Sequence, residues 1–401
     1  MPKGRREVPP TAGLALVPRD FVAAGASLER GVAAFVEQTW AQVECSGTAA
    51  LVVALATLKR LSGRRSVVVP AYTCPLVALA VIRCGLRPVL CDTRPGHFDL
   101  CPRALAAACG EDTLAVLVTH LGGRVADFTM ASAIARDAGA AVIEDAAQSL
   151  GARWRGRPVG GLGDIGVYSL GVGKGLTVYS GGVLVAQDAA LRPELRKTAA
   201  EMAPYRLDWE LRRMVELAGY GLLYRPRGLW LAYGLPLRRK LRAGKLIEAA
   251  GDDCCAEIPL HRVGAWRKRI GANALKRLPG FLAAGSARAA PRRSRLEAID
   301  GVSVLGDTEG DAGVWPFLQV LLPTQQARDE ALRRLWPAGL GVGRLFIHAL
   351  ADYAYLEPHL DGSGIPNARD FAARMLTVTN SEWLDEDDFE QVCRALEESI
   401  H

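Results

Sequence analysis

A single lysine, Lys174, stands between two glycines in the stretch DIGVYSLGVGKGLTVYSGG, residues 164–182. This stretch begins with an apolar run typical of a strand, breaks into glycines, and is followed by a second apolar run. An amine at a strand end, on backbone free to adopt unusual dihedral angles, suits the making and breaking of a Schiff base. The simpler interpretation of these residues alone is a surface turn with a solvated lysine.

A carboxylate, Asp145, ends another apolar run that begins at Ala141. Such a carboxylate either caps the next helix, expected at Ala146 to Gln148, or lies buried and is kept ionised by a cation beside it. The pyridinium nitrogen of pyridoxal phosphate is a cation of this kind, and a carboxylate there keeps the ring protonated as an electron sink.

The third group is a run of small residues, Ser46, Gly47 and Thr48, before an apolar helix predicted to about Leu61. Free backbone N–H groups and a hydroxyl at a helix start can bind an anion, and an ordinary helix N-cap is the alternative. A helix-start anion site, a strand-end carboxylate and a downstream lysine follow one another in the chain order of a fold-type-I pyridoxal phosphate enzyme.

The elements that position these groups alternate between strands and helices. Apolar runs at 66–70, 87–92, 114–120 and 141–145 predict strands, with helices at 72–84, 102–109 and 127–138 between them. Strands buried on both faces and joined by helices predict an α/β fold with a mostly parallel sheet, whose functional groups lie at the carboxyl ends of strands.

Residues 46–182 closely resemble the sugar aminotransferases of the DegT/DnrJ/StrS type. The shared motifs are SGTAAL, VPAYTCP, RPVLCD, VTHLGG, VIEDAAQSLGARWRGRPVGGLGDIGVYSLGVGK and SGG, and the succession EDAAQ…G-D-x-x-x-x-S-x-x-x-x-K is specific to the family. Weaker likeness extends over most of residues 27–400. The resemblance implies a fold-type-I transferase with a large domain, its parallel sheet flanked by helices, and a smaller C-terminal α/β domain.

The resemblance also assigns roles to residues. It implies that Lys174 binds pyridoxal 5′-phosphate as a Schiff base and moves a proton on the substrate, and that Asp145 pairs with the pyridinium nitrogen. Gly47, Thr48 and Ser169 would hold the phosphate, and Gln148 would contact the phenolic oxygen side of the ring. Some relatives have histidine in place of the lysine and act as dehydratases, so the lysine favours transamination.

Three positions depart from the family pattern. Cys74 stands where relatives place an aromatic ring against the cofactor, and Tyr72 is a nearby alternative. Ser180 replaces a frequent glutamate before Gly181. Leu260 replaces the asparagine that reaches the phosphate of the partner subunit in relatives, so this contact is lost or another residue supplies it.

By family analogy, the function is an aminotransferase that takes an amino group from an amino acid, L-glutamate, and gives it to a keto sugar linked to a nucleotide. Cell-surface polysaccharide, glycolipid and secondary-metabolite biosynthesis are the settings that the resemblance implies, with a homodimer as the assembly. A non-sugar carbonyl acceptor and a non-catalytic cofactor-binding relative are the alternatives.

The predicted organisation is an N-terminal arm (1–26), a large domain (27–260) with an apolar and basic insertion at about 205–260, and a helical connection with a small domain (261–401). Within the insertion, residues 214–245 combine tyrosines and a tryptophan with a basic run. This mixture is expected of an interfacial helix pair on a membrane surface or on a lipid-linked substrate. A helical hairpin buried in the dimer or against the active-site mouth is the alternative.

Shorter patterns complete the expected elements. Helices are predicted at 27–40, 283–299, 325–335 and 385–400, and a strand at 315–321. The run Gly341 to Arg344 is expected to bring a basic side chain to the substrate mouth. His348 and His359 lack metal-ligand spacing and are interpreted as structural.

Composition narrows the class of protein further. A net charge of +6 suits an anionic substrate. The sequence has no lysine-rich run with interleaved aromatic residues, so nucleic-acid binding is not expected. The nine cysteines include no CxxC pair, so we expect no metal site and a reduced, cytoplasmic setting, with peripheral membrane contact as a possibility. Neither a signal peptide nor a transmembrane helix is expected.

Overall fold

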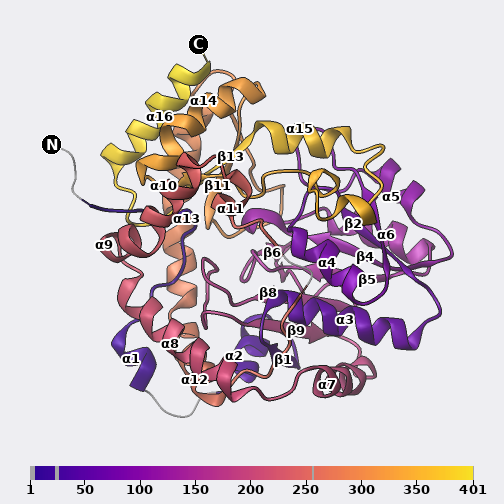
Figure 1. Cartoon of the computed structure of the whole chain (residues 1–401). Helices are drawn as coiled ribbons and strands as arrows, with labels where there is room; N and C mark the ends of the chain where they lie inside the picture. Colours follow the sequence, from indigo (N-terminus) through magenta and orange to yellow (C-terminus); the bar gives the residue numbers. More distant parts are fainter. Residues whose placement is uncertain (1–4, 23–26, 255–256, 401) are drawn as a thin grey trace.

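A seven-stranded mixed sheet lies at the centre of the computed structural model, which describes residues 5–22, 27–254 and 257–400 (Figure 1). Residues 1–4 and 23–26 of the predicted arm, and 255–256 of the predicted insertion, lie outside the described residues. The strand order is β1-β9-β8-β5-β4-β2-β3. The strands are β1 (Ala41–Glu44), β2 (Ser66–Pro70), β3 (Arg87–Cys91), β4 (Thr113–Thr119), β5 (Ala141–Asp145), β8 (Ile165–Ser169) and β9 (Gly182–Ala186).

The prediction of a mostly parallel sheet is confirmed. Strands β3, β2, β4, β5 and β8 pair in parallel, while β9 runs antiparallel between β8 and β1. Because parallel strands end at the same edge of a sheet, Thr119, Asp145 and Ser169 come together there. The covering helices are α3 (Gly47–Leu61), α4 (Pro75–Arg83), α5 (Pro102–Ala108), α6 (Phe128–Asp137) and α7 (Leu191–Met202).

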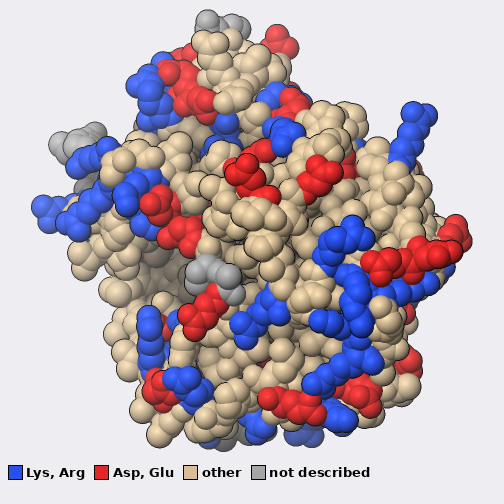
Figure 2. Space-filling view, turned by 45° about the vertical axis from the view of Figure 1, so that its right-hand side comes forward, with Lys and Arg blue, Asp and Glu red and all other residues tan. Residues whose placement is uncertain are grey.

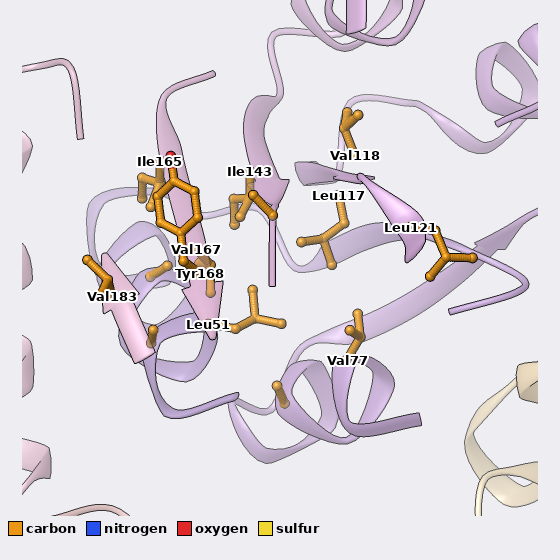
Figure 3. Close-up of a cluster of buried hydrophobic side chains, with 14 of the residues drawn as sticks. Leu51, Val77, Leu117, Val118, Leu121, Ile143, Ile165, Val167, Tyr168 and Val183 are labelled. Carbon is orange, nitrogen blue, oxygen red and sulfur yellow. The ribbon is translucent and has the colours of Figure 1, made fainter. Parts of the chain in front are cut away.

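The core forms where α3 and α4 pack on this sheet (Figure 3). Leu51 and Val77 point from these helices toward the strands, and both are buried. They meet side chains that are almost wholly removed from water, including Leu117, Ile143 and Ile165. Removal of this apolar surface from water stabilises the sheet that carries the strand-end groups.

A second, four-stranded antiparallel sheet lies at the top of Figure 1. Its order is β10-β11-β13-β12, from β10 (Ser303–Val304), β11 (Phe317–Leu321), β12 (Val342–Gly343) and β13 (Met375–Thr379). It has its own apolar core with α14 (Gln325–Leu335) and α16 (Glu386–Ile400). The strand and helices predicted at 315–321, 325–335 and 385–400 are thus confirmed with small shifts of their ends. The remaining C-terminal helices are α12 (Ala265–Leu275), α13 (Leu278–Glu297) and α15 (Pro366–Arg374).

One predicted helix is too long. The helix expected at 27–40 is capped by the Ser27 hydroxyl as predicted, but α2 (Leu28–Phe35) ends early. At Glu37 the backbone has φ 54°, which breaks the helix, and Ala41–Glu44 pair with β9 as an edge strand that the sequence did not reveal. Pairing with a strand far along the chain, Ala41 with Val185 and Glu44 with Gly182, overrides the local helical pattern. The helix predicted at 283–299 is also corrected, because α13 begins five residues earlier, at Leu278.

The insertion is helical, as predicted. It consists of α8 (Leu207–Leu223), α9 (Pro226–Leu229), the π-helical turn η2 (Trp230–Gly234), α10 (Leu235–Arg242) and α11 (Leu246–Ala250), with α8, α9 and α10 along the left-hand edge of Figure 1. Among the described residues, no helix is long and apolar enough to span a membrane.

The N-terminal arm joins the insertion to the rest of the chain. Glu7 donates its backbone N–H to the carbonyl of Pro226, Ala12 to that of Pro316, and Leu14 to that of Gly175. A short helix, α1 (Pro18–Val22), then packs against α12. The arm therefore runs from the insertion past both sheets and beside the loop that carries Lys174.

A buried ion pair attaches α8 to the body of the protein. Arg267, which is fully buried, donates from Nε and Nη2 to the two carboxylate oxygens of Glu210 at 2.9 and 2.6 Å. Its Nη1 donates to the carbonyl of Ser180 at 2.6 Å. Burial acts to raise the pKa of Glu210, and the hydrogen bonds and charge of Arg267 outweigh it and lower that pKa.

We predict that Glu210→Ala lowers the free energy of unfolding by about 3–5 kcal/mol, because it leaves the Arg267 guanidinium buried without its counter-charge. The matched control is Asp208→Ala on the same helix, whose pair with Arg206 is more than half exposed. This control should unfold close to the wild-type midpoint, because solvent screens an exposed ion pair. Urea unfolding of both variants measures the difference, and equal losses would contradict the account of this ion pair.

Candidate active site

Lys174 lies in the loop of residues 170–181 between β8 and β9. The loop is closed by backbone hydrogen bonds from Leu170 to Gly181 (2.7 Å) and from Val178 to Leu170 (3.1 Å). Gly173 has φ +78°, so the predicted unusual backbone beside the lysine is present. The lysine is half-buried and lines a cavity that is partly open to solvent, so its side chain is not fully solvated as the surface-turn alternative expects.

This cavity, of about 260 Å³, lies at the sheet edge where β4, β5 and β8 end and where α3 and α4 begin. The sequence predicts seven site residues in four separate stretches, and the fold brings them all to the wall of this cavity. They are Gly47, Thr48, Cys74, Asp145, Gln148, Ser169 and Lys174.

Asp145 is buried at the end of β5, and its Oδ1 accepts a hydrogen bond from the backbone N–H of Ala147 at 3.1 Å. Burial raises the pKa of this carboxyl, while the bond from Ala147 and the charge of Lys174 act to lower it. The residues that follow Asp145 form a turn and not a helix, so this hydrogen bond closes a turn and the predicted helix cap is wrong. Asp145 is an acid group in the cavity whose ionisation depends on neighbouring cations.

The amine of Lys174 is affected in the opposite direction. Burial lowers its pKa, and Cys74 and Asp145 act to raise it. A neutral amine is the nucleophilic form, so desolvation prepares Lys174 to attack a carbonyl at a lower pH than a surface lysine would.

The start of α3 supplies hydrogen-bond donors to the same cavity. The Ser46 hydroxyl caps the helix by accepting from the N–H of Ala49 at 2.9 Å. The first N–H groups of a helix have no partner within it, and those of Gly47 and Thr48 stand at the cavity wall. A side chain at position 47 would approach the Cβ of Ser169 to 3.1 Å, so glycine keeps this corner open.

Gln148 is oriented by the glycine loop that follows β4. Its Oε1 accepts from the N–H of Gly122 at 2.7 Å. Gly122 has φ +62°, and a Cβ there would stand 2.2 Å from Gln319, so the bond needs glycine at that position. This bond fixes the amide group of Gln148 against the cavity.

Sequence reasoning gave no role to His120, which also lines the cavity. Its Nδ1 accepts from the N–H of Ala126 at 3.1 Å, so its Nε2 carries the proton and donates to Glu144 at 3.0 Å. Glu144 also accepts from the N–H groups of Gly160 (2.7 Å), Leu162 (2.6 Å) and Gly163 (2.6 Å). The available signal was the polar sequence HLGG at the end of an apolar strand.

The departure at Cys74 leaves a small neutral group in the cavity. Burial is the main cause that raises the pKa of this thiol to about 12. Tyr72 does not replace the missing ring, because it is buried elsewhere, with its hydroxyl on the backbone of Phe346 and its ring edge-on to Phe371. Among the described residues, the aromatic rings on the cavity wall are those of His120 and Phe346.

A second cavity, of about 460 Å³, adjoins the first and shares Cys74, Gln148 and Lys174 with it. Arg344 lines it, as expected, and donates from Nη2 to the carbonyls of Ile347 and Ala372. The insertion reaches this cavity, in agreement with the alternative that placed it at the active-site mouth. Its lining residues from the insertion are Tyr233, Ala249, Ala250, Gly251, Asp252 and Cys254.

The other two departures lie at the edge of the site. The Ser180 hydroxyl donates to the carbonyl of Cys45 at 2.7 Å and so ties the lysine loop to the start of α3. Leu260 is absent from the described wall of the cavity. Its neighbour Pro259 accepts a hydrogen bond from the Cys45 thiol at 3.3 Å, which places this segment beside the same turn.

Comparisons with known proteins agree with this arrangement. The sequence model of the DegT/DnrJ/EryC1/StrS aminotransferase family matches residues 23–204 and 266–397. The chain is 42% identical over 151 residues to the L-glutamine:scyllo-inosose aminotransferase of Streptomyces griseus, which covers 37% of this chain and 35% of that protein. It is 35% identical over 165 residues to the GDP-perosamine synthase of Caulobacter vibrioides, covering 41% of this chain and 44% of that protein.

These matches span less than half the length of the curated relatives. The whole fold is similar to the solved structure of DesI, determined in the presence of its TDP-sugar product. The two superpose with a TM-score of 0.76 at 21% identity, over 100% of this chain and 94% of that one.

We predict that the Lys174 amine titrates below its ordinary pKa of 10.5 in protein freed of carbonyl compounds. Asp145→Asn should lower this pKa further, because it removes a charge that stabilises the ammonium form. NMR titration of isotope-labelled methyl groups placed on the lysines measures both values, and the signal absent from Lys174→Ala identifies the residue. A midpoint at or above the ordinary value, or an upward shift in Asp145→Asn, would contradict this electrostatic account.

Proposed function

The chain belongs to the DegT/DnrJ/EryC1/StrS aminotransferase family, and we propose that it is a pyridoxal-phosphate-dependent aminotransferase acting on a keto sugar. One observation carries the proposal: a desolvated lysine amine and a buried carboxylate face one cavity at the start of a long helix. A protein that bound the cofactor without turnover would need no nucleophilic amine placed in this way.

The residues present fit pyridoxal phosphate. The Thr73 and Thr119 hydroxyls are buried on the cavity wall without a hydrogen-bond partner among the described residues. The N–H groups at the start of α3 suit a phosphate, and Asp145 suits a protonated ring nitrogen. When bound, the group supplies an electron sink for the carbon that loses or gains the amine.

The roles proposed for the chain's own residues follow from their places. Lys174 holds the cofactor covalently through Nζ and moves a proton at the substrate carbon. Asp145 keeps the ring nitrogen protonated. Gln148 would contact the phenolic oxygen side of the ring, and Cys74 would contact the cofactor as a neutral thiol. The phosphate is held by Gly47, Thr48 and Ser169.

The proposed donor is an amino acid, L-glutamate, with L-glutamine, named in one relative, as the second donor to test. Arg344 supplies a cation for the acid groups of the substrates. One similar protein is named GDP-perosamine synthase, and the similar structure of DesI was determined with its TDP-sugar product. A nucleotide-linked keto sugar is therefore the first acceptor to test. A non-sugar carbonyl remains the second candidate, because scyllo-inosose in the name of one relative is a cyclic ketone without a nucleotide.

We also propose a cytoplasmic homodimer without a nucleic-acid partner. On the face shown in Figure 2, basic side chains gather in a run at the lower right that acidic side chains border, and wide uncharged areas surround it. The homodimer is proposed from the family resemblance alone, and within one chain the segment at Leu260 lies beside the turn that opens α3. The proposed domains are the arm (1–26), the large domain with its insertion (27–260) and the connection with the small domain (261–401).

The core of the proposal is tested by fixing the cofactor with borohydride. Wild-type protein loaded with pyridoxal phosphate should retain it on Lys174 after reduction, as mass spectrometry of the peptides will show. Lys174→Ala should abolish the fixed adduct, whereas the control Lys197→Ala, at an exposed position, should keep it. An adduct that persists on another lysine in Lys174→Ala would refute the assignment.

The proposed membrane contact through residues 214–245 rests on the apolar surface of the insertion. Val215 and Leu222 of α8 are 73% and 80% exposed. Arg239 and Arg242 on α10 are exposed too and would suit anionic lipid headgroups. The double variant Val215→Glu and Leu222→Glu should reduce flotation with equal-part phosphatidylcholine–phosphatidylglycerol liposomes by more than about tenfold.

The control for flotation is Leu61→Glu, at an apolar position of α3 that is 54% exposed. This variant should float as the wild type does. If the wild type and the double variant float equally well with the liposomes, the membrane contact is wrong. It is also wrong if all the proteins stay in solution.

A further inference from the structure

An open groove of about 560 Å³ runs between α8, the α9–η2 segment and the N-terminal arm. Its volume lies in the range of small-molecule sites, about 300–1,000 Å³. The lining is mostly aliphatic and aromatic and includes Tyr220, Leu223 and Leu229. Its single charged side chain among the described residues, Glu216, is paired with Arg212 at 3.0 Å and Arg213 at 2.6 Å.

The groove is continuous with the catalytic cavity. The cavity of about 460 Å³ that contains Lys174 shares five lining residues with the groove. The shared residues are Pro10, Thr11, Val172, Gly173 and Tyr233. Since Val172 and Gly173 directly precede Lys174, a ligand whose reacting group meets the lysine can extend past them into the groove.

Apolar surface continues from the groove to the outside of the insertion. Leu222 and Leu231, next in sequence to groove residues on α8 and η2, are 80% and 59% exposed. The sequence model of the family leaves residues 205–265 unmatched, so most of this wall belongs to the part of the chain that family likeness does not explain. A nucleotide, with its charged phosphates, gains little from such a wall, whereas a hydrocarbon chain gains from each methylene removed from water.

We propose that the groove binds the hydrocarbon chain of the acceptor, so that the keto sugar reaches Lys174 attached to a lipid. This inference rests on the proposed aminotransferase function for the identity of the reacting group. The hydrocarbon chain of the lipid lies along Gly219 and Tyr220 on one wall of the groove and along Ala232 and Tyr233 on the other. The sugar lies in the adjoining cavity. The exposed leucines at the rim let the chain pass from a lipid surface into the groove.

Two substitutions narrow the groove from facing walls. Gly219 lies in a helix, and a Cβ added there meets no atom within 4 Å, so Gly219→Leu fills open space. Ala232→Leu narrows the opposite wall. The matched control is Gly280→Leu, on the exposed face of α13, where an added Cβ also meets nothing within 4 Å.

The experiment is calorimetric titration of the full-length, cofactor-loaded protein with inorganic phosphate, hexyl phosphate and dodecyl phosphate below micelle-forming concentrations. Each methylene removed from water is worth about fourfold in affinity. Wild type and Gly280→Leu should bind dodecyl phosphate at least on the order of tenfold more tightly than hexyl phosphate. Gly219→Leu and Ala232→Leu should lose this gain while melting as the wild type does.

Other outcomes overturn the inference. The groove does not bind the hydrocarbon chain if the wild type binds dodecyl phosphate no more tightly than hexyl phosphate. The same follows if both narrowed variants show the same increase in affinity as the wild type. If a second copy of the protein fills the groove, the narrowed variants would dissociate into smaller assemblies. In that case neither the wild type nor any variant would bind dodecyl phosphate more tightly than hexyl phosphate.

The same wild-type samples separate this inference from the proposed function. Glutamate should change the absorbance of the bound cofactor. A change with glutamate but no binding of dodecyl phosphate would overturn the groove assignment alone. Binding of dodecyl phosphate without any change from glutamate or glutamine would overturn the aminotransferase function and leave the groove as an apolar binding site.

Discussion

A carboxyl group and an amine are both desolvated at one edge of the sheet, and the strands around them are arranged to hold the two groups together. The Asp145 carboxylate and the Lys174 amine each lose hydration, and each shifts the pKa of the other toward its charged form. Strands β5 and β8 are direct neighbours, with Asp145 opposite Val167, and this pairing brings the two groups to one cavity. Successive side chains on a strand point to opposite faces. Glu144 therefore holds the loop at 160–163 while Asp145 faces the site.

Much of this arrangement could be predicted from the sequence because it depends on local patterns. Apolar runs that end in polar residues identified the parallel strands, and the order of Thr48, Asp145 and Lys174 identified the cofactor chemistry. The edge strand Ala41–Glu44 could not be found in this way, since it depends on pairing with β9 far along the chain. The role of His120 was missed for a similar reason, because its partner Glu144 becomes a neighbour only through strand pairing.

The insertion shows the same limit more clearly. Its helices and their exposed apolar face could be predicted from composition, but its place in the fold could not. The Arg267–Glu210 pair attaches α8 to the body, and Tyr233 brings the insertion to the catalytic cavity. The groove has walls from the arm, the lysine loop and the insertion, three segments without any shared sequence signal. Exposed leucines that looked like a surface property thus lie at the rim of a passage to Lys174.

We propose that this site moves an amine from an amino acid to a sugar carbonyl. The most direct measurement uses L-glutamate with a heavy nitrogen in its amino group, mixed with the protein and a panel of keto sugars carried on nucleotides and on isoprenoid phosphates. Mass spectrometry of the products should find the heavy nitrogen on one sugar in place of its keto oxygen, and on none with Lys174→Ala. If glutamate converts the cofactor but no sugar on either carrier gains the heavy nitrogen, a sugar is not the acceptor. If Lys174→Ala labels the sugar as well as the wild type does, Lys174 is not the catalytic residue.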